Sequence, residues 1–245
     1  EMPELKMPVM LWTGKHLLMT NSGKSYIFVE GRLKDLGGDI WVETDTPACS
    51  DYLALDAGVH IYRIEGDTAV KIENPGDRRA KKLFMLDGTP HVWFYGGSEN
   101  DIMQLDAGGL KKTPYHKLIA DNKLRVLEIA DGAVASIVSE PGKSTERLFI
   151  MRGGKGSFVK LPKGVSRPNI SRFEPATGDR HVMVVDDDTS CSLWVLDAHS
   201  KLKTVNFPES MFGVESSKFV PGADGAYQLF YNDDGKAAYI FHAWP

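Results

Sequence analysis

The sequence predicts an all-β fold made of six repeats of four strands, and three observations support this prediction. Short runs with a periodicity of two, rich in Val, Ile, Trp, Tyr and Phe and bounded by Gly, Asp, Asn or Pro, are typical of β-strands. The strand pattern recurs along the chain at intervals of 34 to 47 residues. The last repeat lacks one strand, and the chain begins with a surplus one.

The predicted strands account for most of the chain. They include the runs MLWTG, DIWVETD, VHIYRIEGD, HVWFYGG, RVLEIADG, HVMVVDDD, CSLWVLDA and AYQLFY. No run has the apolar spacing of an amphipathic helix of about 12 residues. The segment PYHKLIADNKL comes nearest, and we expect at most one helical turn in it.

The repeat is clearest in the strand that follows the Gly-Lys turns. Its apolar centres are Ile27, Ile61, Ile102, Leu148, Leu193 and Ile240, at intervals of 34, 41, 46, 45 and 47 residues. A period near 40 residues is typical of a β-propeller, in which each repeat forms one four-stranded blade. The predicted blades cover residues 9–37, 38–77, 80–117, 122–164, 168–208 and 214–245.

Turn residues agree with this division. The turns between first and second strands carry Gly after a polar residue, as in LDGTP and ADGA, because a tight hairpin needs positive φ. Short turns such as EGRL, EGDT and AGGL connect the third and fourth strands. Each repeat is therefore expected to fold as a meander of four antiparallel strands.

The two ends of the chain predict how the ring closes. The sixth repeat stops after its third strand, at Pro245, whereas the segment PELKMP at residues 3–8 supplies an extra strand. An N-terminal strand that completes the last blade leaves no exposed sheet edge at the closure. We therefore predict one six-bladed propeller domain over residues 1–245. Two stacked β-sandwiches would explain the strand content but not the repeat.

The repeats resemble those of six-bladed propellers of the TolB and NHL kinds, for example in SLWVLDAHSKLKTVNFP. The resemblance is one of pattern and covers the chain. No family-defining motif is matched, so the resemblance assigns no functional residues.

Composition and charge narrow the choice of partners and compartments. A net charge of −4 gives no reason to expect binding to nucleic acid or insertion into an anionic membrane. The chain begins at Glu1 and not at Met, which favours a periplasmic or secreted protein over a cytoplasmic one. Cys49 and Cys191 are expected on opposite faces of distant blades, beyond the reach of a disulfide.

The Gly-Lys-Ser tripeptides at residues 23–25 and 142–144 do not predict a nucleotide site. A phosphate-binding loop needs a Gly five residues earlier and a helix afterwards. Leu18 and Ile137 occupy the first of these positions, and a strand follows each tripeptide. We interpret both as hairpin turns between second and third strands.

Other candidate chemistry is also better explained by the fold. His91 and His181 begin second strands in two repeats, which predicts a shared packing role. The Asp-rich segments at 186–190 and 231–236 fall in predicted turns, where Asp and Asn bond the local backbone. The sequence therefore predicts no cofactor, no metal centre and no catalytic residue.

An enzyme remains the alternative. Some six-bladed propellers are metal-dependent lactonases or phosphotriesterases, with Glu, Asn and Asp converging on the central channel. The predicted first strands carry or follow Glu43, Glu128, Glu174, Asn122 and Asn169. A divalent-metal-dependent hydrolase with its site at the channel is the alternative function.

The main hypothesis is a binding module. The long connections at 74–82, 114–123, 162–170 and 208–217 are predicted to share one face with the turns between second and third strands. Arg, Tyr, Phe and Met, which are enriched in interface cores, gather there. The partner is predicted to be a protein or peptide with an acidic surface, and one version of this function is an inhibitor or immunity protein. The candidate partner-binding residues are Arg78, Arg79, Lys82, Tyr115, His116, Lys117, Arg167, Met211 and Phe212.

Overall fold

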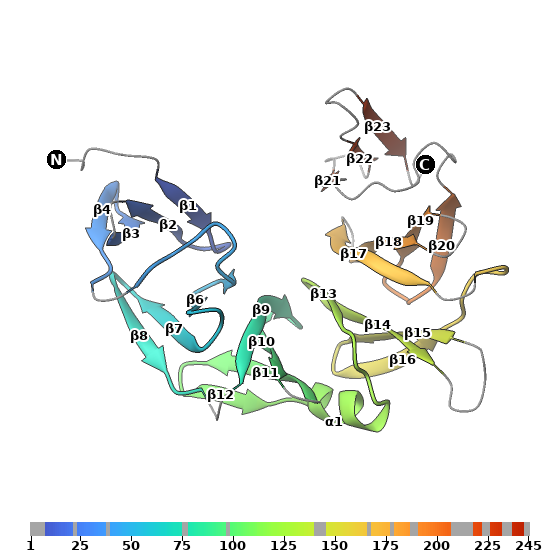
Figure 1. Cartoon of the computed structure of the whole chain (residues 1–245), viewed down its shortest axis with the longest axis horizontal. Coiled ribbons are helices and arrows are strands. Elements are labelled where there is room, and N and C mark those ends of the chain that lie inside the picture. The colour runs from blue at the N-terminus through green and yellow to red at the C-terminus, as the bar shows by residue number, and fades with distance from the viewer. Residues whose placement is uncertain are drawn as a thin grey trace. The chain divides into compact units, whose positions relative to one another are not determined.

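Antiparallel strands make up nearly all the regular structure in the computed structural model of the chain (Figure 1). The chain divides into two units, Glu1–Asp121 and Asn122–Pro245. The structure describes residues 8–21, 24–37, 40–74, 78–96, 99–139, 146–165, 168–176, 179–186, 191–206, 218–221, 226–231 and 237–242.

The first unit contains three four-stranded sheets and one helix. The first sheet has the order β1 (Val9–Trp12), β2 (Leu17–Asn21), β3 (Lys24–Val29) and β4 (Arg32–Asp35). The second has β5 (Ala48–Cys49), β6 (Tyr52–Leu55), β7 (His60–Glu65) and β8 (Thr68–Ile72). The third has β9 (Arg79–Leu86), β10 (Thr89–Gly96), β11 (Glu99–Asp106) and β12 (Gly109–Lys112), and helix α1 (Pro114–Asp121) follows it.

The second unit continues the same meander. Its four-stranded sheets are β13 (Glu128–Ala130), β14 (Ala133–Ser139), β15 (Glu146–Arg152) and β16 (Lys155–Val159), then β17 (Asn169–Ala176), β18 (Arg180–Asp186), β19 (Cys191–Leu196) and β20 (Leu202–Asn206). Within the described residues the last sheet has three strands, β21 (Lys218–Pro221), β22 (Ala226–Tyr231) and β23 (Ala237–His242).

The predicted repeat centres all lie in the third strand of a sheet. Ile27, Ile61, Ile102, Leu148 and Leu193 are each 0% exposed, and Ile240 lies in β23. Burying one such side chain contributes about 1.5–3 kcal/mol to folding. The repeat in the sequence is therefore the repeat of the core.

Apolar clusters join neighbouring sheets within each unit. In the first unit, Cys49 and Tyr52 of the second sheet pack with Phe94 and Leu105 of the third. In the second unit, Leu148 and Ile150 pack with Phe173 and Trp194. Face-to-face packing of successive sheets is the arrangement that a propeller requires.

Two sequence predictions need correction. Residues 40–45 of the run DIWVETD, the part that the structure describes, are not a strand: the amide of Val42 donates to the hydroxyls of Thr20 and Ser25, at 3.2 Å each, in place of a sheet ladder. Helix α1 is longer than the single turn expected, with eight residues. Its buried side chains Tyr115 and Ile119 lie one turn apart on one face, and such packing stabilises helices with weak intrinsic propensity.

Ring closure remains a prediction. Residues 3–7 of the proposed closing strand lie outside the described part of the chain, and Pro8 is not in a strand. Among the described residues, no helix is long and apolar enough to cross a membrane.

Candidate functional site

Two of the predicted partner-binding residues meet on a buried carboxylate. Arg78, just before β9, donates from Nη1 to Oδ2 of Asp101 at 2.7 Å. His116, in α1, donates from Nδ1 to Oδ1 of the same residue at 2.9 Å. The Asp101 side chain is 4% exposed, whereas those of Arg78 and His116 are 38% and 42% exposed. We call these three residues the Asp101 cluster.

The Asp101 cluster supports the predicted loop face in the third sheet. Arg78 comes from the connection into this sheet, His116 from the connection out of it, and Asp101 from β11 near the turn between second and third strands. These connections therefore lie on one side of the sheet, as the sequence predicts. Asp101 accepts a hydrogen bond from each of these two side chains, and both Arg78 and His116 remain partly exposed to solvent.

A basic and aromatic patch extends from this side along β9 and β10. Arg79 lies opposite Tyr95 and Lys82 lies opposite Trp93, so each pair projects from the same face of the sheet. A bulge between Trp93 and Phe94 inserts Lys81, whose ammonium lies 5.7 Å from the centre of the Tyr95 ring. Tyr95 is 47% exposed. The patch is defined by Arg79, Lys81, Lys82, Trp93 and Tyr95.

The remaining predicted residues have different outcomes. Tyr115 is 1% exposed and donates from its hydroxyl to Oδ2 of Asp87 at 2.5 Å, so it belongs to the core and offers no surface to a partner. Lys117 is exposed on α1. Arg167, Met211 and Phe212 lie outside the described residues.

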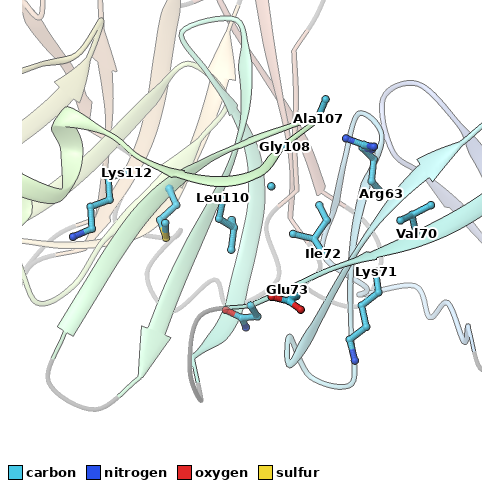
Figure 2. Close-up of a pocket in the computed structure, with 12 residues that line it drawn as sticks. Arg63, Val70, Lys71, Ile72, Glu73, Ala107, Gly108, Leu110 and Lys112 are labelled. Atoms are coloured by element: carbon cyan, nitrogen blue, oxygen red, sulfur yellow. The ribbon is translucent and has the colours of Figure 1, made fainter.

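A groove that the sequence did not reveal runs between the outer strands of the second and third sheets (Figure 2). Its volume is about 630 Å³. Figure 2 shows Arg63, Val70 and Lys71 on the β8 side and Lys112 on the β12 side. The groove joins strands from two repeats, so no local sequence signal marks it. Its lining residues are Arg63, Val70–Asn74, Met103, Ala107–Leu110 and Lys112.

An acidic cavity of about 480 Å³ lies beside β6 and β9 in the first unit. Glu43, Asp45 and Asp56 line it, together with Lys81 and the exposed Trp41. Glu43 was predicted on a first strand but lies in the irregular segment before β5. Within the described ranges, no group of three or more His, Cys, Asp or Glu side chains is placed to hold a metal ion.

The histidines at equivalent positions are packing residues. His91 is 3% exposed, donates from Nδ1 to the Thr89 carbonyl at 2.9 Å, and lies 6.0 Å from the Phe84 ring. His181 is 4% exposed and lies 5.2 Å from the Phe173 ring. Burial lowers the pKa of both imidazoles, which keeps them neutral. This bears out the packing role that their repeat-equivalent positions predict.

The first Gly-Lys-Ser tripeptide runs into a strand, as predicted. Lys24 and Ser25 belong to β3, and the Ser25 hydroxyl is hydrogen-bonded to that of Thr20 at 2.7 Å. Both hydroxyls also accept the Val42 amide. Ser25 therefore has a structural role, because its hydroxyl is bonded within the protein. The second tripeptide lies outside the described residues.

Comparison with known proteins confirms the fold class. No protein-family model matches the chain, and no curated protein matches it. A streptogramin B lyase structure matches with a TM-score of 0.51 and 12% identity, covering 97% of this chain and 83% of that one. Virginiamycin B lyase from Staphylococcus aureus matches with a TM-score of 0.52 and 13% identity, covering 96% and 83%. Hsv2 from Kluyveromyces lactis matches with a TM-score of 0.51 and 14% identity, covering 97% and 75%.

The fold is of the β-propeller type. At identities this low, the likeness to these structures shows the fold alone. The resemblance of the repeats is thereby confirmed for the propeller type, and the choice of TolB and NHL propellers stays a prediction. Two of the matched structures are named as lyases and the third as Hsv2, so the function must be argued from this chain's own residues.

Proposed function

We propose that the chain is a non-catalytic binding module that captures an acidic protein or peptide. The binding surface is the loop side of the third sheet, which is the side that carries the Asp101 cluster. The observation that carries this proposal is the Asp101 cluster. A buried aspartate orients the guanidinium of Arg78 and the imidazole of His116, two partly exposed side chains that are far apart in the sequence. Their preorganisation reduces the entropy that a partner must overcome when it binds.

The neighbouring patch supplies further contacts of the kind found in interfaces. Arg79 and Lys82 are exposed, and Tyr95 and Trp93 lie opposite them. Arg and aromatic residues are enriched in interface cores, and an arginine fork binds carboxylates with two parallel hydrogen bonds. An acidic partner would therefore find charge and flat apolar surface together. Inhibition of a toxin or enzyme by such capture is one form that this function can take.

The hydrolase alternative has less support. Of its predicted carboxylates, Glu43 lines the acidic cavity with Asp45 and Asp56, but these three do not form a metal-holding group in the described part of the chain. Glu128 and Glu174 lie in β13 and β17 of the other unit. A lactone and ester panel assayed with added Ca²⁺ or Mn²⁺ would reveal this activity if it exists.

The test is partner capture with matched charge reversals. Immobilised protein should retain a partner, and the double variant Arg79→Glu with Lys82→Glu should weaken its retention about tenfold or more, since like charges then face the partner. Lys155→Glu with Lys160→Glu makes the same change in charge on and beside β16 and should leave retention unchanged. Equal loss in both variants, or in neither, would contradict the proposal.

A second variant tests the preorganisation itself. Asp101→Asn removes the carboxylate that holds Arg78 and His116, and it should weaken capture by a smaller factor while the circular dichroism spectrum stays that of a β protein. Raising the salt concentration from about 0.05 M to about 0.5 M should also weaken capture by the wild type, because exposed charges are screened over a few ångströms at high salt.

A further inference from the structure

We propose that the groove between β8 and β12 binds an extended acidic peptide, which adds as a strand to the open edge of β8. This surface is separate from the loop side of the third sheet, and its occupancy does not require the proposed partner capture. Four observations lead to this inference: the open strand edges, the charge, the apolar floor and a hydrogen-bond acceptor without a partner.

The groove is bordered by strand edges. β8 pairs only with β7, and β12 pairs only with β11, so each is the last strand of its sheet in the described structure. Five consecutive residues, Val70–Asn74, line the groove. Because successive side chains of a strand point to opposite faces, a consecutive lining shows that the edge of β8 itself borders the groove. Its unpaired amides and carbonyls are a template for another strand.

The charge of the groove selects an acidic occupant. Arg63, Lys71 and Lys112 line it, against one carboxylate, Glu73. Neither Lys71 nor Lys112 has an ion-pair partner among the described residues, and both are exposed. Arg63 is held in place by two hydrogen bonds to Oε1 of Glu65, from Nε at 2.8 Å and from Nη2. Lysines at opposite sides of the groove can therefore pair with carboxylates on a bound chain.

The floor between the charges is apolar. Val70 is 44% exposed, which leaves a β-branched side chain on the surface, and Met103 of β11, which also lines the groove, is 6% exposed. Figure 2 shows Ile72 and Leu110 projecting between the two strands. A peptide that alternates acidic and apolar side chains would place its apolar set on this floor, on the face of Val70 and Ile72, and its carboxylates on the opposite face, from which Lys71 projects.

Asn74 supplies an acceptor at one end of the groove. Its Nδ2 donates to the Arg78 carbonyl at 2.6 Å and to the Val59 carbonyl at 3.4 Å. Its Oδ1 is buried and has no partner in the described structure. A buried acceptor left without a donor costs about 1–3 kcal/mol. The amide of an added strand would relieve that cost.

Fluorescence anisotropy with the whole chain tests the inference directly. The probe is a fluorescein-labelled octapeptide of alternating Glu and Val, compared with Gln/Val and Lys/Val octapeptides of the same length. We expect the Glu/Val peptide to bind at least about tenfold more tightly than the Gln/Val peptide, and the Lys/Val peptide not to bind. N-methylation of alternate amides on one edge of the Glu/Val peptide should abolish binding, because strand addition depends on main-chain hydrogen bonds.

Matched variants locate the binding. Lys71→Glu with Lys112→Glu should weaken binding of the Glu/Val peptide about tenfold or more, whereas Lys155→Glu with Lys160→Glu should not change it. Equal binding of Glu/Val and Gln/Val peptides would overturn the charge argument, and tolerance of N-methylation would overturn strand addition. Absence of binding would show that the lysines only protect the sheet edges from aggregation.

The same preparations separate this inference from the proposed function. Arg79→Glu with Lys82→Glu should leave peptide binding intact while it weakens partner capture. If the wild-type protein captures its partner but does not bind the Glu/Val peptide, the groove inference alone is overturned. Peptide binding without any captured partner would overturn the proposed function alone.

Discussion

Two junctions between successive sheets, one in each unit, are built by different means. In the first unit a main-chain hydrogen bond joins the second and third sheets in addition to their apolar cluster: the Ala80 amide donates to the Gly58 carbonyl at 2.8 Å. In the second unit the hydrogen bonds between the fourth and fifth sheets come from side chains. His181 donates from Nε2 to the Asp131 carbonyl at 2.8 Å, and Arg152 donates from Nη1 to the Asp197 carbonyl at 3.0 Å.

The difference shows what each junction is sensitive to. A main-chain contact leaves no room for a side chain, whereas a side-chain contact depends on charge and protonation. His91 stands at the position in the third sheet that His181 occupies in the fifth, yet its hydrogen bond goes to Thr89 of its own strand. Repeat-equivalent residues thus have the same packing role and different bonding roles.

The largest expected effect is at the main-chain junction. Gly58 has a φ of +84°, and a Cβ there would lie 2.1 Å from the Ala80 carbonyl oxygen. Gly58→Ala should therefore lower the free energy of unfolding by about 3 kcal/mol or more, from steric overlap together with backbone strain. Gly66 has a φ of +63° and open space around it, so Gly66→Ala should cost only about 1 kcal/mol. Urea unfolding followed by circular dichroism measures both, and equal costs would refute the junction argument.

The next effect compares the two histidines. His181→Leu removes the hydrogen bond between sheets and should cost about 2 kcal/mol, as one bond is lost and the Asp131 carbonyl loses a donor. His91→Leu removes a bond within one strand, between residues two apart, and should cost about 1 kcal/mol. The urea concentrations at the midpoint of unfolding, measured at neutral pH, give the loss of stability in both variants. A larger cost at His91 would show that the junction bond contributes little.

The two histidines should also make stability depend on pH. Burial lowers the pKa of His181 below 6.5, the bond to the Asp131 carbonyl opposes this, and the positive charge of Arg152 lowers it further. Because the unfolded imidazole binds a proton more readily, stability is complete above about pH 6.5 and declines as the pH falls towards the folded pKa. Burial acts in the same direction on His91.

Urea midpoints at about pH 7.5 and pH 5.5 test this dependence. The loss of stability between these values should be smaller in His181→Leu than in the wild type. An unchanged loss in that variant would mean that other groups dominate the acid response. His91→Leu provides the matched comparison for a histidine that does not join two sheets.

The smallest effect is expected at Arg152. Its Nε and Nη2 are buried without partners in the described structure, and burial lowers its pKa. Arg152→Met removes one hydrogen bond but also two unsatisfied donors and a charge, so stability at neutral pH should change by less than about 1 kcal/mol. The loss of the charge should also raise the pKa of His181 and flatten the pH dependence. A strongly destabilised variant would show that Arg152 has a partner of its own.

Sequence patterns predicted the sheets well because the recurring apolar positions correspond to one residue in the third strand of each sheet. Ile27, Ile61, Ile102, Leu148 and Leu193 recur with the period of a blade, and each is completely buried. The run DIWVETD failed because alternation alone cannot show that the Val42 amide would bond two hydroxyls instead of a neighbouring strand. Helix α1 was underestimated because Tyr115 and Ile119 stabilise it through the core.

The candidate site was predicted in part. Residue types and connection lengths indicated Arg78, Arg79, Lys82, His116 and Lys117. The alternation in HVWFYGG could also have marked Trp93 and Tyr95, since their neighbours Val92 and Phe94 are the buried set. No pattern indicated the groove, whose two sides come from strands of different repeats.

By itself, the sequence determined the strands, their meander and the period of the core, because alternation, turn residues and repeat length are local properties of the chain. Only the tertiary structure decided that Asp101 would hold Arg78 and His116 together, that Tyr115 would be buried, and that β8 and β12 would enclose a basic groove. These features depend on contacts between residues that are distant in the sequence. Hydrogen bonds and ion pairs require short distances in space, and the spacing of residues along the chain does not give these distances.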